Sequence, residues 1–384
     1  MQIRRLLVEH LRNLEAVSLD ELTTLNFFIG DNGAGKTSLL EAISIASQGR
    51  SFRHHKVNTV INQQQQQLSV FVECIDDGQN RHKIGIQRDK KNNYLVRIDG
   101  ANASTLAQLS SILPVVVLDA TSFELLDGSS SVRRKFIDWG VFHVEHGFYD
   151  KWKNLNRLLK QRNSLLRAGV QDYEQIAPWD KELISLSVAI EEDRRSYLLK
   201  FQQALNASNQ ALDEKLSNYK VSYRNGWGIE KLDFANIQEH IHEPLDADEL
   251  ARLLQSSFER DCRYHRTHVG PHRADMQIRV GLQSAKDIYS RGQKKTLVAA
   301  MKLAQADVVA FSTGKKAVLL LDDLPSELDD QHLARFIEYI QQQGYQSFIT
   351  AVDDRIYTKN RHAKARMFHL ERGRITPQNA QGEA

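Results

Sequence analysis

The sequence predicts an α/β fold that includes an antiparallel β subdomain and is interrupted by an inserted, mainly helical lobe. Three observations support this prediction. A strand, a glycine-rich loop and a helix follow one another near the start of the chain. Short strands separated by turns come next, and a long segment with helical spacing follows before strands and helices alternate again. Strand–helix alternation on both sides of a helical segment is typical of one α/β domain with an insertion.

The first predicted elements are two strands and a helix. Residues 2–9 mix alternation with β-branched side chains, and residues 24–29 form an apolar run that Gly30 ends. Both patterns favour strands. Residues 36–47 place their apolar side chains on one helical face. The order strand, glycine loop, helix is therefore expected over residues 24–47.

Residues 68–118 predict a small antiparallel sheet. Strand-forming runs at residues 68–73, 83–86 and 94–98 are separated by turn signals such as Asp99-Gly100. The glutamine run at residues 63–67 is expected to be a solvated loop before this sheet.

A helical lobe is predicted after the composition changes near residues 125–131. From residue 132 to about 264 apolar side chains recur at helical spacing, without enough repeats for an extended coiled coil. A strand at 275–280, a helix at 293–310 and strands at 317–321 and 346–350 follow. We therefore expect a discontinuous head (1–125 and 266–384) and a lobe (126–265).

Composition excludes several classes of protein. With 384 residues, 41% apolar and 26% charged, the chain can bury a core and is not mainly disordered. Its longest apolar run, residues 317–321, is far shorter than the ~20 residues of a membrane-spanning helix. The first residues do not resemble a secretory signal, and two cysteines cannot form a disulfide framework. A soluble, cytoplasmic protein is expected, and its net charge of +3 requires any nucleic-acid surface to be a local basic patch.

Residues 30–37 match the phosphate-binding pattern G-x-x-x-x-G-K-[ST]. Such a loop points successive backbone N–H groups at one anion, and the helix N-terminus that follows adds its dipole. Lys36 is expected to reach the β- and γ-phosphates, and the Thr37 hydroxyl to hold Mg²⁺. The residues expected to bind the nucleotide are Gly30, Asp31, Asn32, Gly33, Ala34, Gly35, Lys36, Thr37 and Ser38.

A buried strand that ends in two carboxylates supplies the second half of such a site. Asp322 and Asp323 follow the apolar run 317–321. Asp322 is expected to hold Mg²⁺, as a Walker-B aspartate does. Asp323 is expected to position and deprotonate the attacking water.

A third motif precedes the helix at 293–310. Ser290, Gly292 and Gln293 can be an ordinary helix N-cap, or can offer a hydroxyl and backbone N–H groups to an anion. Because a Walker-B strand follows, the motif resembles the signature of ABC-type ATPases, and Ser326-Glu327-Leu328-Asp329 resembles their D-loop. In that family the signature of one subunit completes the nucleotide site of another, which implies ATP-dependent head-to-head dimerisation.

Nearly the whole chain resembles the RecF family of bacterial recombination mediators. The stretches that carry this resemblance are residues 11–13, 49–53, 133–139, 152–163, 270–273, 290–293 and 321–323. The resemblance implies an ABC-type ATPase head related to SMC proteins, a helical second lobe, and ATP and Mg²⁺ as cofactors. It also implies binding of double-stranded DNA and gap junctions, slow ATP hydrolysis, and action with RecR and RecO in loading RecA.

The chain departs from related ATPases at three places. Residues 350–353 lack the histidine with which transporter-type ATPases contact the γ-phosphate, and the second Walker-B acid is an aspartate instead of a glutamate. Both features indicate a slow hydrolase used as a clamp switch. Residues 118–123 lack the Ser-Pro-Glu-Asp sequence of many RecF proteins.

The sequence fits two other functions less well. A transporter-type ABC ATPase subunit should carry the catalytic glutamate and the switch histidine, which this chain lacks. A long SMC-type organiser should have a much longer helical insertion.

Several further side chains allow more than one interpretation. Cys262, His265, His268 and His272 have spacings that a zinc site could use, although the segment crosses from helix to strand. Basic residues at 50–56 are either contacts to DNA phosphates or a solvated loop. Those at 133–135 are either DNA contacts or an ion-pair hinge between lobes, and Lys90-Lys91 is a charged turn. Arg162 and Arg167 are candidates for lining a DNA cleft.

Overall fold

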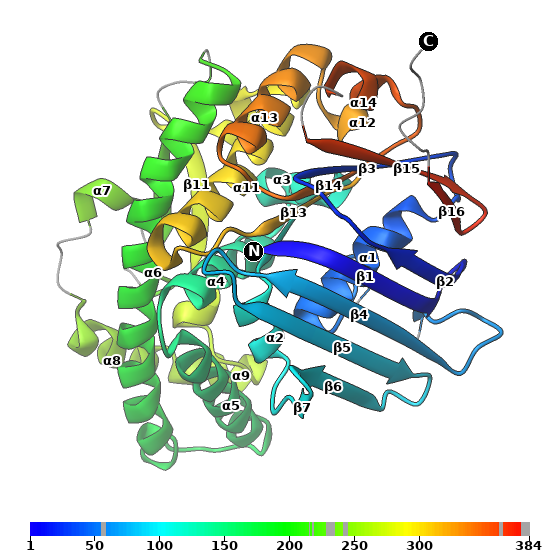
Figure 1. The fold of residues 1–384 in the computed structure, drawn as a ribbon. Helices are drawn as coiled ribbons and strands as arrows, with labels where there is room; N and C mark the ends of the chain where they lie inside the picture. The colour runs from blue at the N-terminus through cyan, green and yellow to red at the C-terminus, as the bar shows by residue number, and fades with distance from the viewer. Residues whose placement is uncertain are drawn as a thin grey trace, which may run out of the picture. The chain divides into compact units, whose positions relative to one another are not determined.

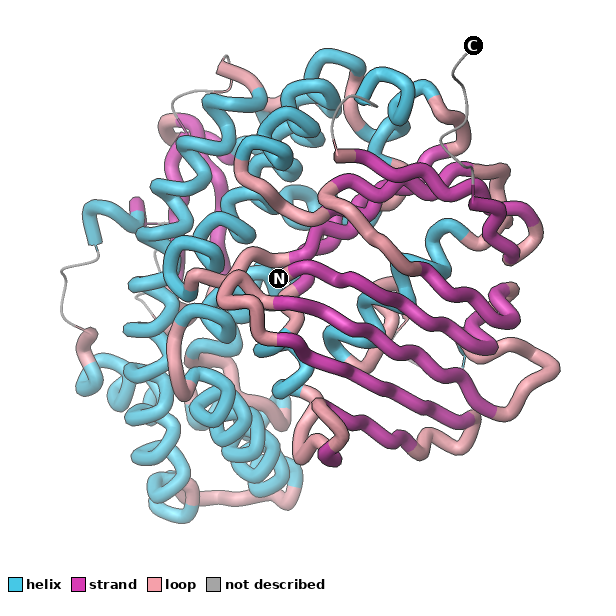
Figure 2. The backbone as a smooth tube through the Cα atoms, viewed as in Figure 1, coloured by secondary structure: helices cyan, strands magenta, loops and turns pink. Residues whose placement is uncertain are grey.

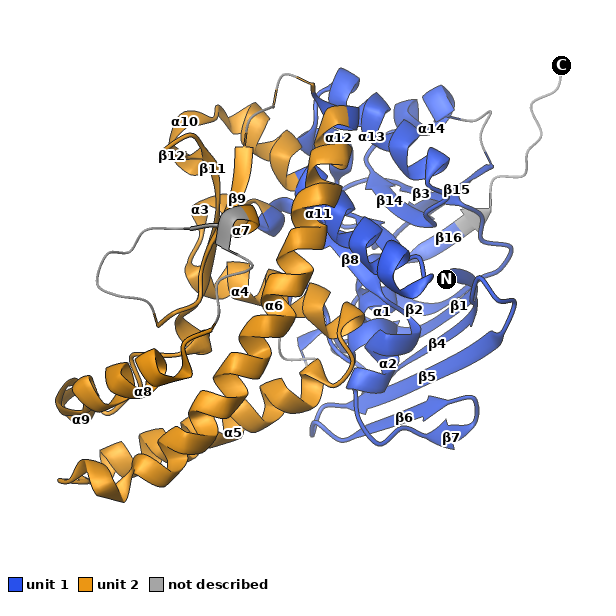
Figure 3. Cartoon of the chain, turned by 90° about the vertical axis from the view of Figure 1, so that its left-hand side faces the viewer, with its two compact units in different colours: residues 1–122, 211–213, 299–384 blue, residues 123–210, 214–298 orange. Residues whose placement is uncertain are grey.

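A computed structural model describes residues 1–54, 59–214, 216, 219–227, 235–240, 245–360 and 364–377. The chain divides into two compact units (Figure 3). Unit 1 contains Met1–Ser122, Ala211–Asp213 and Ala299–Ala384, and unit 2 contains Phe123–Gln210 and Glu214–Val298. The expected head of residues 1–125 and 266–384 and lobe of 126–265 stay a prediction.

Unit 1 contains a mainly parallel six-stranded sheet of order β16-β15-β3-β14-β13-β8 (Figure 1). Its strands are β3 (Leu25–Ile29), β8 (Val115–Leu118), β13 (Val318–Leu321), β14 (Ser347–Ala351), β15 (Ala365–Glu371) and β16 (Arg374–Pro377). Every residue of β3, β13 and β14 is buried. Near-continuous apolar runs suit strands that are covered on both faces, so the predicted strands 24–29, 317–321 and 346–350 are confirmed.

An antiparallel sheet of order β2-β1-β4-β5-β6-β7 completes the β structure of unit 1 (Figure 2). Its strands are β1 (Gln2–Leu11), β2 (Leu14–Leu19), β4 (Gln67–Ile75), β5 (Arg81–Asp89), β6 (Tyr94–Ile98) and β7 (Ala101–Asn102). The predicted antiparallel sheet is confirmed, except that its expected end at residue 118 is wrong. Residues 115–118 form β8, which pairs in parallel with β13, because this unbroken apolar run suits a parallel sheet better than an alternating one.

Helix α1 (Lys36–Gln48) joins the two sheets into one core. It contacts β1, β4 and β5 of the antiparallel sheet and β14 of the parallel sheet. Ten of its residues are buried, including Leu39, Leu40 and Ile43, which lie in one hydrophobic cluster with residues of both sheets. The helix that carries Lys36 and Thr37 is therefore held rigidly on two sides.

Of the remaining helices of unit 1, α2 (Ala107–Ile112) leads from the antiparallel sheet into β8, and the others follow β13 or β14 in the chain. Those that follow β13 or β14 are α12 (Leu324–Glu327), α13 (Asp330–Gln342) and α14 (Arg355–Asn360). Helix α11 (Arg291–Thr313) begins in unit 2 and ends in unit 1. Asp329 caps α13 by accepting hydrogen bonds from the backbone N–H groups of Gln331 (3.1 Å) and His332 (3.0 Å).

Unit 2 is mainly helical, as predicted, but it also contains a small sheet. Its helices are α3 (Glu124–Asp127), α4 (Ser130–Val144), α5 (Phe148–Arg167), α6 (Ala177–Leu212), α7 (Ile237–His240), α8 (Ala247–Ser256), α9 (Phe258–Tyr264) and α10 (Ala285–Ile288). The strands β9 (Tyr219–Arg224), β10 (Ala235–Asn236), β11 (Asp275–Val280) and β12 (Gln283–Ser284) form a sheet of order β10-β9-β11-β12.

Strand β9 was not predicted, because helical spacing dominates the sequence from residue 132 to about 264. The strand is only six residues long, and it pairs antiparallel with β11, which the sequence did predict. A short strand that depends on a partner more than fifty positions away leaves little local signal. In the part of the chain that the structure describes, no helix combines the length and apolar character needed to cross a membrane.

Candidate nucleotide site

The glycine loop between β3 and α1 takes a backbone shape that its glycines make possible. Gly30 has φ 156° and Gly35 has φ 111°, both in the region that side chains rarely adopt. A Cβ atom on Gly30 would lie 2.2 Å from the carbonyl oxygen of Leu370 in β15. The backbone N–H of Gly373 donates to the carbonyl of Ala34 (2.9 Å), so the chain around β15 supports the loop.

Lys36 folds back over this loop. Its Nζ donates to the carbonyl oxygens of Gly30 (2.5 Å) and Asp31 (2.9 Å). Burial lowers the pKa of Lys36, while the carboxylates of Asp323, Asp322 and Asp31 act in the opposite direction. The amine is therefore held at the mouth of the loop, where it can exchange carbonyl oxygens for phosphate oxygens.

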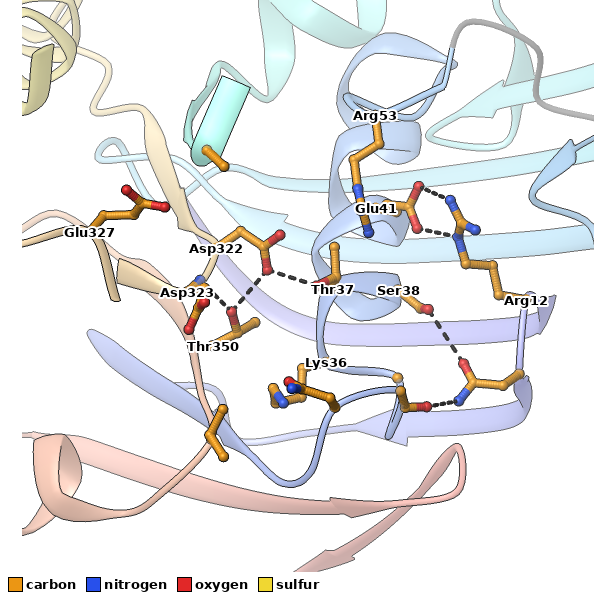
Figure 4. A pocket seen from close by; sticks show the side chains of 16 residues that line it. Arg12, Lys36, Thr37, Ser38, Glu41, Arg53, Asp322, Asp323, Glu327 and Thr350 are labelled. Carbon is orange, nitrogen blue, oxygen red and sulfur yellow. Dashed lines mark hydrogen bonds and ion pairs between the residues drawn. The ribbon is translucent and has the colours of Figure 1, made fainter. Parts of the chain in front are cut away.

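Asp322 stands at the end of β13 and meets two hydroxyl groups (Figure 4). Thr37 Oγ1 donates to Asp322 Oδ1 (2.8 Å), and Thr350 Oγ1 donates to the same oxygen (2.9 Å). Burial raises the pKa of Asp322, and the hydrogen bonds from Thr37 and Thr350 oppose this rise. Residues 285 positions apart in the chain thus share one hydrogen bond, the pairing expected of Walker-A and Walker-B motifs.

Asp323 turns away from the strand direction immediately after Asp322. Its φ of 53° is left-handed, and its backbone N–H donates to Thr350 Oγ1 (2.8 Å). The hydroxyl of Thr350 therefore fixes both acids, accepting from the backbone of one and donating to the carboxylate of the other. The sequence had given Thr350 no role in the site; residues 350–353 stood out only because they contain no histidine.

These groups surround a cavity of about 520 Å³, a volume within the range of ~300–1,000 Å³ that is usual for ligand pockets. Predicted residues that line it are Asn32, Gly33, Gly35, Lys36, Thr37, Ser38, Asp322 and Asp323. Gly30, Asp31 and Ala34 belong to the same loop but do not line the cavity. The cavity is also lined by residues that the sequence analysis did not assign to a nucleotide site. They are Arg12, Asn13, Glu41, Arg53, Ala120, Thr350 and Val352, together with Glu327 of the D-loop-like segment.

A buried ion pair anchors one wall of the cavity. Glu41 of α1 is fully buried and accepts from Arg12 Nε (2.5 Å) and Nη2 (2.8 Å) in the turn between β1 and β2. Ser51 Oγ also donates to Glu41 (2.6 Å), and Asn13 Nδ2 donates to the carbonyl of Gly33 (3.0 Å). No local sequence pattern marked this pair, because Glu41 does not lie on the face of Leu39, Leu40 and Ile43; its burial requires a partner that only the fold supplies.

Arg53 lies at the nucleotide site. The segment 50–56 was predicted to contact DNA or to be a solvated loop. Arg53 lines the cavity, and its charge opposes the rise in the pKa of Asp322 (Figure 4). Arg50 is exposed, and residues 55 and 56 lie outside the described part of the chain.

The signature-like residues lie together at the start of α11, in unit 2. The backbone N–H of Ser290 donates to Gln293 Oε1 (2.9 Å), and the backbone N–H of Gln293 donates to Ser290 Oγ (3.3 Å). This reciprocal arrangement is a capping box, so the helix N-cap interpretation is confirmed. Ser290, Gly292 and Gln293 are also exposed, which leaves them accessible to a ligand.

The possible zinc ligands contact other groups. His268 Nδ1 lies 2.8 Å from Asp261, while the ring N–H groups of His265 and His272 face the carbonyls of Leu166 (3.1 Å) and Thr267 (3.0 Å). Among the described residues, no cluster of three or more His, Cys, Asp and Glu side chains is arranged to hold a metal ion.

One interpretation of an arginine is corrected. Arg162 is fully buried and binds Asp180 (2.6 Å) and Asp261 (2.7 Å), so it lines no exposed cleft; Arg167 is exposed. Arg133 forms an ion pair with Asp275 (2.7 Å); both residues belong to unit 2, whereas the expected boundary at residue 266 would place them in lobe and head, so the hinge stays a prediction. The sequence pattern could not separate buried from exposed arginines on one helix.

Comparison with known proteins agrees with this geometry. The family model described as RecF/RecN/SMC N terminal domain matches residues 2–376. Proteins named DNA replication and repair protein RecF are 40% identical in Cellvibrio japonicus (98% of this chain, 99% of the relative) and 39% identical in Pseudomonas syringae pv. syringae (98% of each).

Solved structures show the same fold. A structure of the recombination mediator protein RecF-ATP in the RecFOR pathway aligns with a TM-score of 0.84 and 25% identity, over 98% of this chain and 97% of that one. An Smc head domain from Pyrococcus furiosus aligns with a TM-score of 0.55 and 14% identity, over 97% and 95%. The predicted fold class, an ABC-type P-loop ATPase head with an antiparallel β subdomain and helical additions, is confirmed. The chain belongs to the RecF/RecN/SMC family, and within it to the RecF proteins.

Proposed function

We propose that this protein binds ATP in the cavity of unit 1, hydrolyses it slowly, and acts in DNA repair and recombination as an ATP-controlled DNA-binding protein. One observation carries the proposal: Thr37 and Asp322, from the two motifs that such a site requires, share a hydrogen bond in a cavity that Lys36 also lines. The RecF relatives support the assignment to repair and recombination.

In this proposal each part of the loop has a role toward ATP. The backbone N–H groups of residues 32–37 hold the phosphates, and Lys36 neutralises charge on the β- and γ-phosphates. The hydroxyl of Thr37 and the carboxylate of Asp322 are hard oxygen ligands at one point, a donor set that fits Mg²⁺. A bound Mg²⁺ would supply charge neutralisation at the phosphates.

Asp323 is the proposed general base. It lines the cavity next to Asp322, so it can accept a proton from the water that attacks the γ-phosphate, releasing ADP and phosphate. Its side chain is one methylene shorter than that of a glutamate, and residues 350–353 lack the histidine with which transporter-type ATPases contact the γ-phosphate. Both differences support slow hydrolysis.

ATP-dependent dimerisation is the proposed conformational switch. Ser290, Gly292 and Gln293 present an exposed helix N-terminus, which suits the phosphates of ATP bound to a second copy. Residues 1–125 and 266–384 would act as the head, and residues 126–265 as the lobe. ATP drives closure only if it binds the closed dimer more tightly than the open monomer.

We further propose that the closed dimer holds double-stranded or gapped DNA and acts with RecR and RecO upstream of RecA. The relatives are named for DNA replication and repair and for the RecFOR pathway, which supports this assignment.

The test is to measure molecular mass by light scattering with ATP and Mg²⁺, with ADP and without nucleotide. Wild type should dimerise only with ATP. Ser290→Arg should remain monomeric yet bind ATP as wild type does, whereas the control Ser185→Arg, at an exposed serine of α6, should still dimerise. A dimer of Ser290→Arg, or an equal loss of ATP binding in it, would contradict the proposed in-trans role.

DNA binding is tested separately by retention of a gapped duplex with ATP, ADP or no nucleotide. Retention should require ATP and weaken steeply as salt rises. A protein that dimerises with ATP but retains no duplex at low salt would exclude the proposed DNA function.

A further inference from the structure

From residue 153 onward, the exposed face of helix α5 in unit 2 contains cations and no acids. From residue 153 to residue 167 the helix contains five basic and no acidic side chains. One of the five, Arg162, is buried, and the other four are exposed: Lys153, Arg157, Lys160 and Arg167. This density of positive charge stands out in a protein whose net charge is only +3.

The four exposed cations form one line along the helix. Their spacing of four, three and seven residues keeps them within an arc of about 80° at 3.6 residues per turn. Exposed Ser164 lies in the same line. At 1.5 Å per residue the line runs about 21 Å along the helix axis. We call Lys153, Arg157, Lys160, Ser164 and Arg167 the α5 stripe.

The opposite face of α5 is firmly packed, so the stripe must face outward. Leu155, Leu158 and Leu166 are buried, and Arg162 among them binds Asp180 and Asp261. The second oxygen of Asp261 faces His268 Nδ1 (2.8 Å). These buried acids bind Arg162 and His268 on the packed side of α5, and no ion pair joins either of them to a cation of the stripe.

Among the described residues, the cations of the stripe lack the carboxylate partners that some other basic residues of α5 and α6 have. Lys151, one turn earlier on α5, binds Asp193 (2.8 Å), and Arg194 and Arg195 of α6 bind Asp138 and Glu191. In the described part of the chain, none of the four stripe cations makes an ion pair or a side-chain hydrogen bond. Lys151, Arg194 and Arg195 therefore have carboxylate partners, and the four stripe cations have none that the structure describes.

The basic surface continues past the end of α5 onto the segment after α9. His265 Nδ1 contacts the carbonyl of Leu166 (3.1 Å), and the backbone N–H of Thr267 donates to Asn163 (2.8 Å). Next to these anchors Arg266 is exposed and lies 6.0 Å from the ring of Tyr264, which is 56% exposed. Arginine and tyrosine side chains both contribute contacts to DNA phosphates.

We propose that the α5 stripe binds the phosphate backbone of double-stranded DNA. DNA presents about one negative charge per 1.7 Å of its axis, so a line of cations with a serine donor matches a line of phosphates. The stripe has no large apolar side chain for a membrane surface or for the centre of a protein interface. This inference rests on the proposed DNA-binding function and names the surface that performs it.

The test is the salt dependence of duplex binding by the full-length protein, with ATP and without it. In Arg157→Gln/Lys160→Gln/Arg167→Gln the slope of log affinity against log salt should fall by about 2 to 3, because each lost phosphate contact removes about 0.9. Arg157→Lys/Arg167→Lys should keep the wild-type slope. The matched control Arg4→Gln/Lys91→Gln/Arg97→Gln removes the same charge from exposed positions of unit 1 and should also keep it.

The outcomes separate this inference from the function on which it rests. If wild type binds no duplex, the proposed function itself is wrong. If wild type binds and the α5 triple variant keeps its slope, the stripe proposal is overturned while DNA binding stands, and an acidic protein would be the occupant to seek. Equal losses in the two triple variants would overturn it as well, because net charge would then explain the effect. Circular dichroism should show both triple variants folded, since all six substituted side chains are exposed.

Discussion

At the scale of single residues, Thr350 organises the candidate site. Its one hydroxyl donates to Asp322 Oδ1 and accepts from the backbone N–H of Asp323. The proposed metal ligand and the proposed base are therefore positioned by the same atom. Thr350 itself is buried, so this atom is shielded from solvent.

Thr350→Val tests this role because valine keeps the shape and removes the hydroxyl. The N–H of Asp323 and the carboxylate of Asp322 would each lose a hydrogen bond to this hydroxyl, at a cost of about 1 kcal/mol per bond in the free energy of unfolding. Displacement of both acids should slow ATP hydrolysis about ten- to a hundredfold. Steady-state phosphate release measures the rate, and Thr350→Ser should stay near wild type. Equal rates in the valine variant and wild type would show that Thr350 positions neither acid.

Two glycines of the phosphate-binding loop should respond differently to substitution by alanine. In Gly30→Ala the new Cβ would meet the backbone oxygen of Leu370 at 2.2 Å, so the loop or β15 must move. We expect the free energy of unfolding to fall by about 3 kcal/mol or more, and ATP binding to be lost. In Gly33→Ala the new Cβ would meet no other atom of the described residues, and only the φ of 83° disfavours alanine. We therefore expect a loss of about 1 kcal/mol in the free energy of unfolding. Urea unfolding measures both, and equal costs would contradict the packing described for the loop.

The sequence predicted the parts of the site that depend on short motifs. Lys36, Thr37 and Asp322 were identified because a phosphate-binding loop and a strand-end carboxylate have characteristic local patterns. Thr350, Arg12 and Glu41 were missed as site residues because their contacts arise from pairing of β13 with β14 and from packing of α1 against the β1–β2 turn. Such contacts join residues that are distant in the chain, and no local pattern records them.

At the scale of elements, α5 shows how one helix uses the same residue type in two ways. Arg162 lies on the packed face with two acids, and Arg167, five residues later, is exposed. Helical spacing predicted the helix, but the burial of Arg162 depends on Asp180 and Asp261, which lie 18 and 99 positions away. The prediction that Arg162 lines an exposed cleft was wrong for that reason.

Substitution of these two arginines should give opposite results. Arg162→Met leaves the buried Asp180 and Asp261 without their cation, which should cost about 3–5 kcal/mol in the free energy of unfolding. Arg167→Gln changes an exposed side chain and should stay within about 0.5 kcal/mol of wild type. Guanidinium unfolding followed by circular dichroism provides the measurement. A loss below 1 kcal/mol for Arg162→Met would contradict a structural role of the buried ion pairs.

The segment 270–273 should make unit 2 sensitive to acid. Burial lowers the pKa of His272 to about 4, and the nearby charges of Arg273, Arg134 and Arg162 act in the same direction. The N–H at Nε2 donates to the carbonyl of Thr267, while Nδ1 is buried and has no hydrogen-bond partner in the described part of the chain. The neutral ring therefore fits this position and a charged ring does not.

Because unfolded histidine has a pKa near 6.5, the unfolded chain binds the extra proton first on acidification. The contribution of neutral His272 to the free energy of unfolding is fully present above about pH 6.5. As the pH falls toward 4 this contribution is lost, by up to about 3 kcal/mol. Denaturant unfolding at a series of pH values measures this, and His272→Gln should lack that component. An unchanged pH profile in the glutamine variant would show that His272 is not the group responsible.

At the scale of the whole molecule, the proposed function depends on ATP occupying the cavity of unit 1. The proposed dimer and the proposed DNA clamp both require a nucleotide-controlled state, and a structure of RecF-ATP is among the solved structures with this fold. The nucleotide site is also the feature for which sequence motifs, geometry and relatives agree.

Calorimetric titration of ATP, with and without Mg²⁺, tests that claim most directly. Wild type and Lys315→Ala, which removes an exposed amine elsewhere in unit 1, should bind ATP with equal affinity, and Mg²⁺ should strengthen both. Lys36→Ala should bind at least about tenfold more weakly, through loss of a charge-assisted contact, and Asp322→Asn should no longer respond to Mg²⁺. Wild-type affinity in Lys36→Ala together with a full Mg²⁺ response in Asp322→Asn would contradict the account.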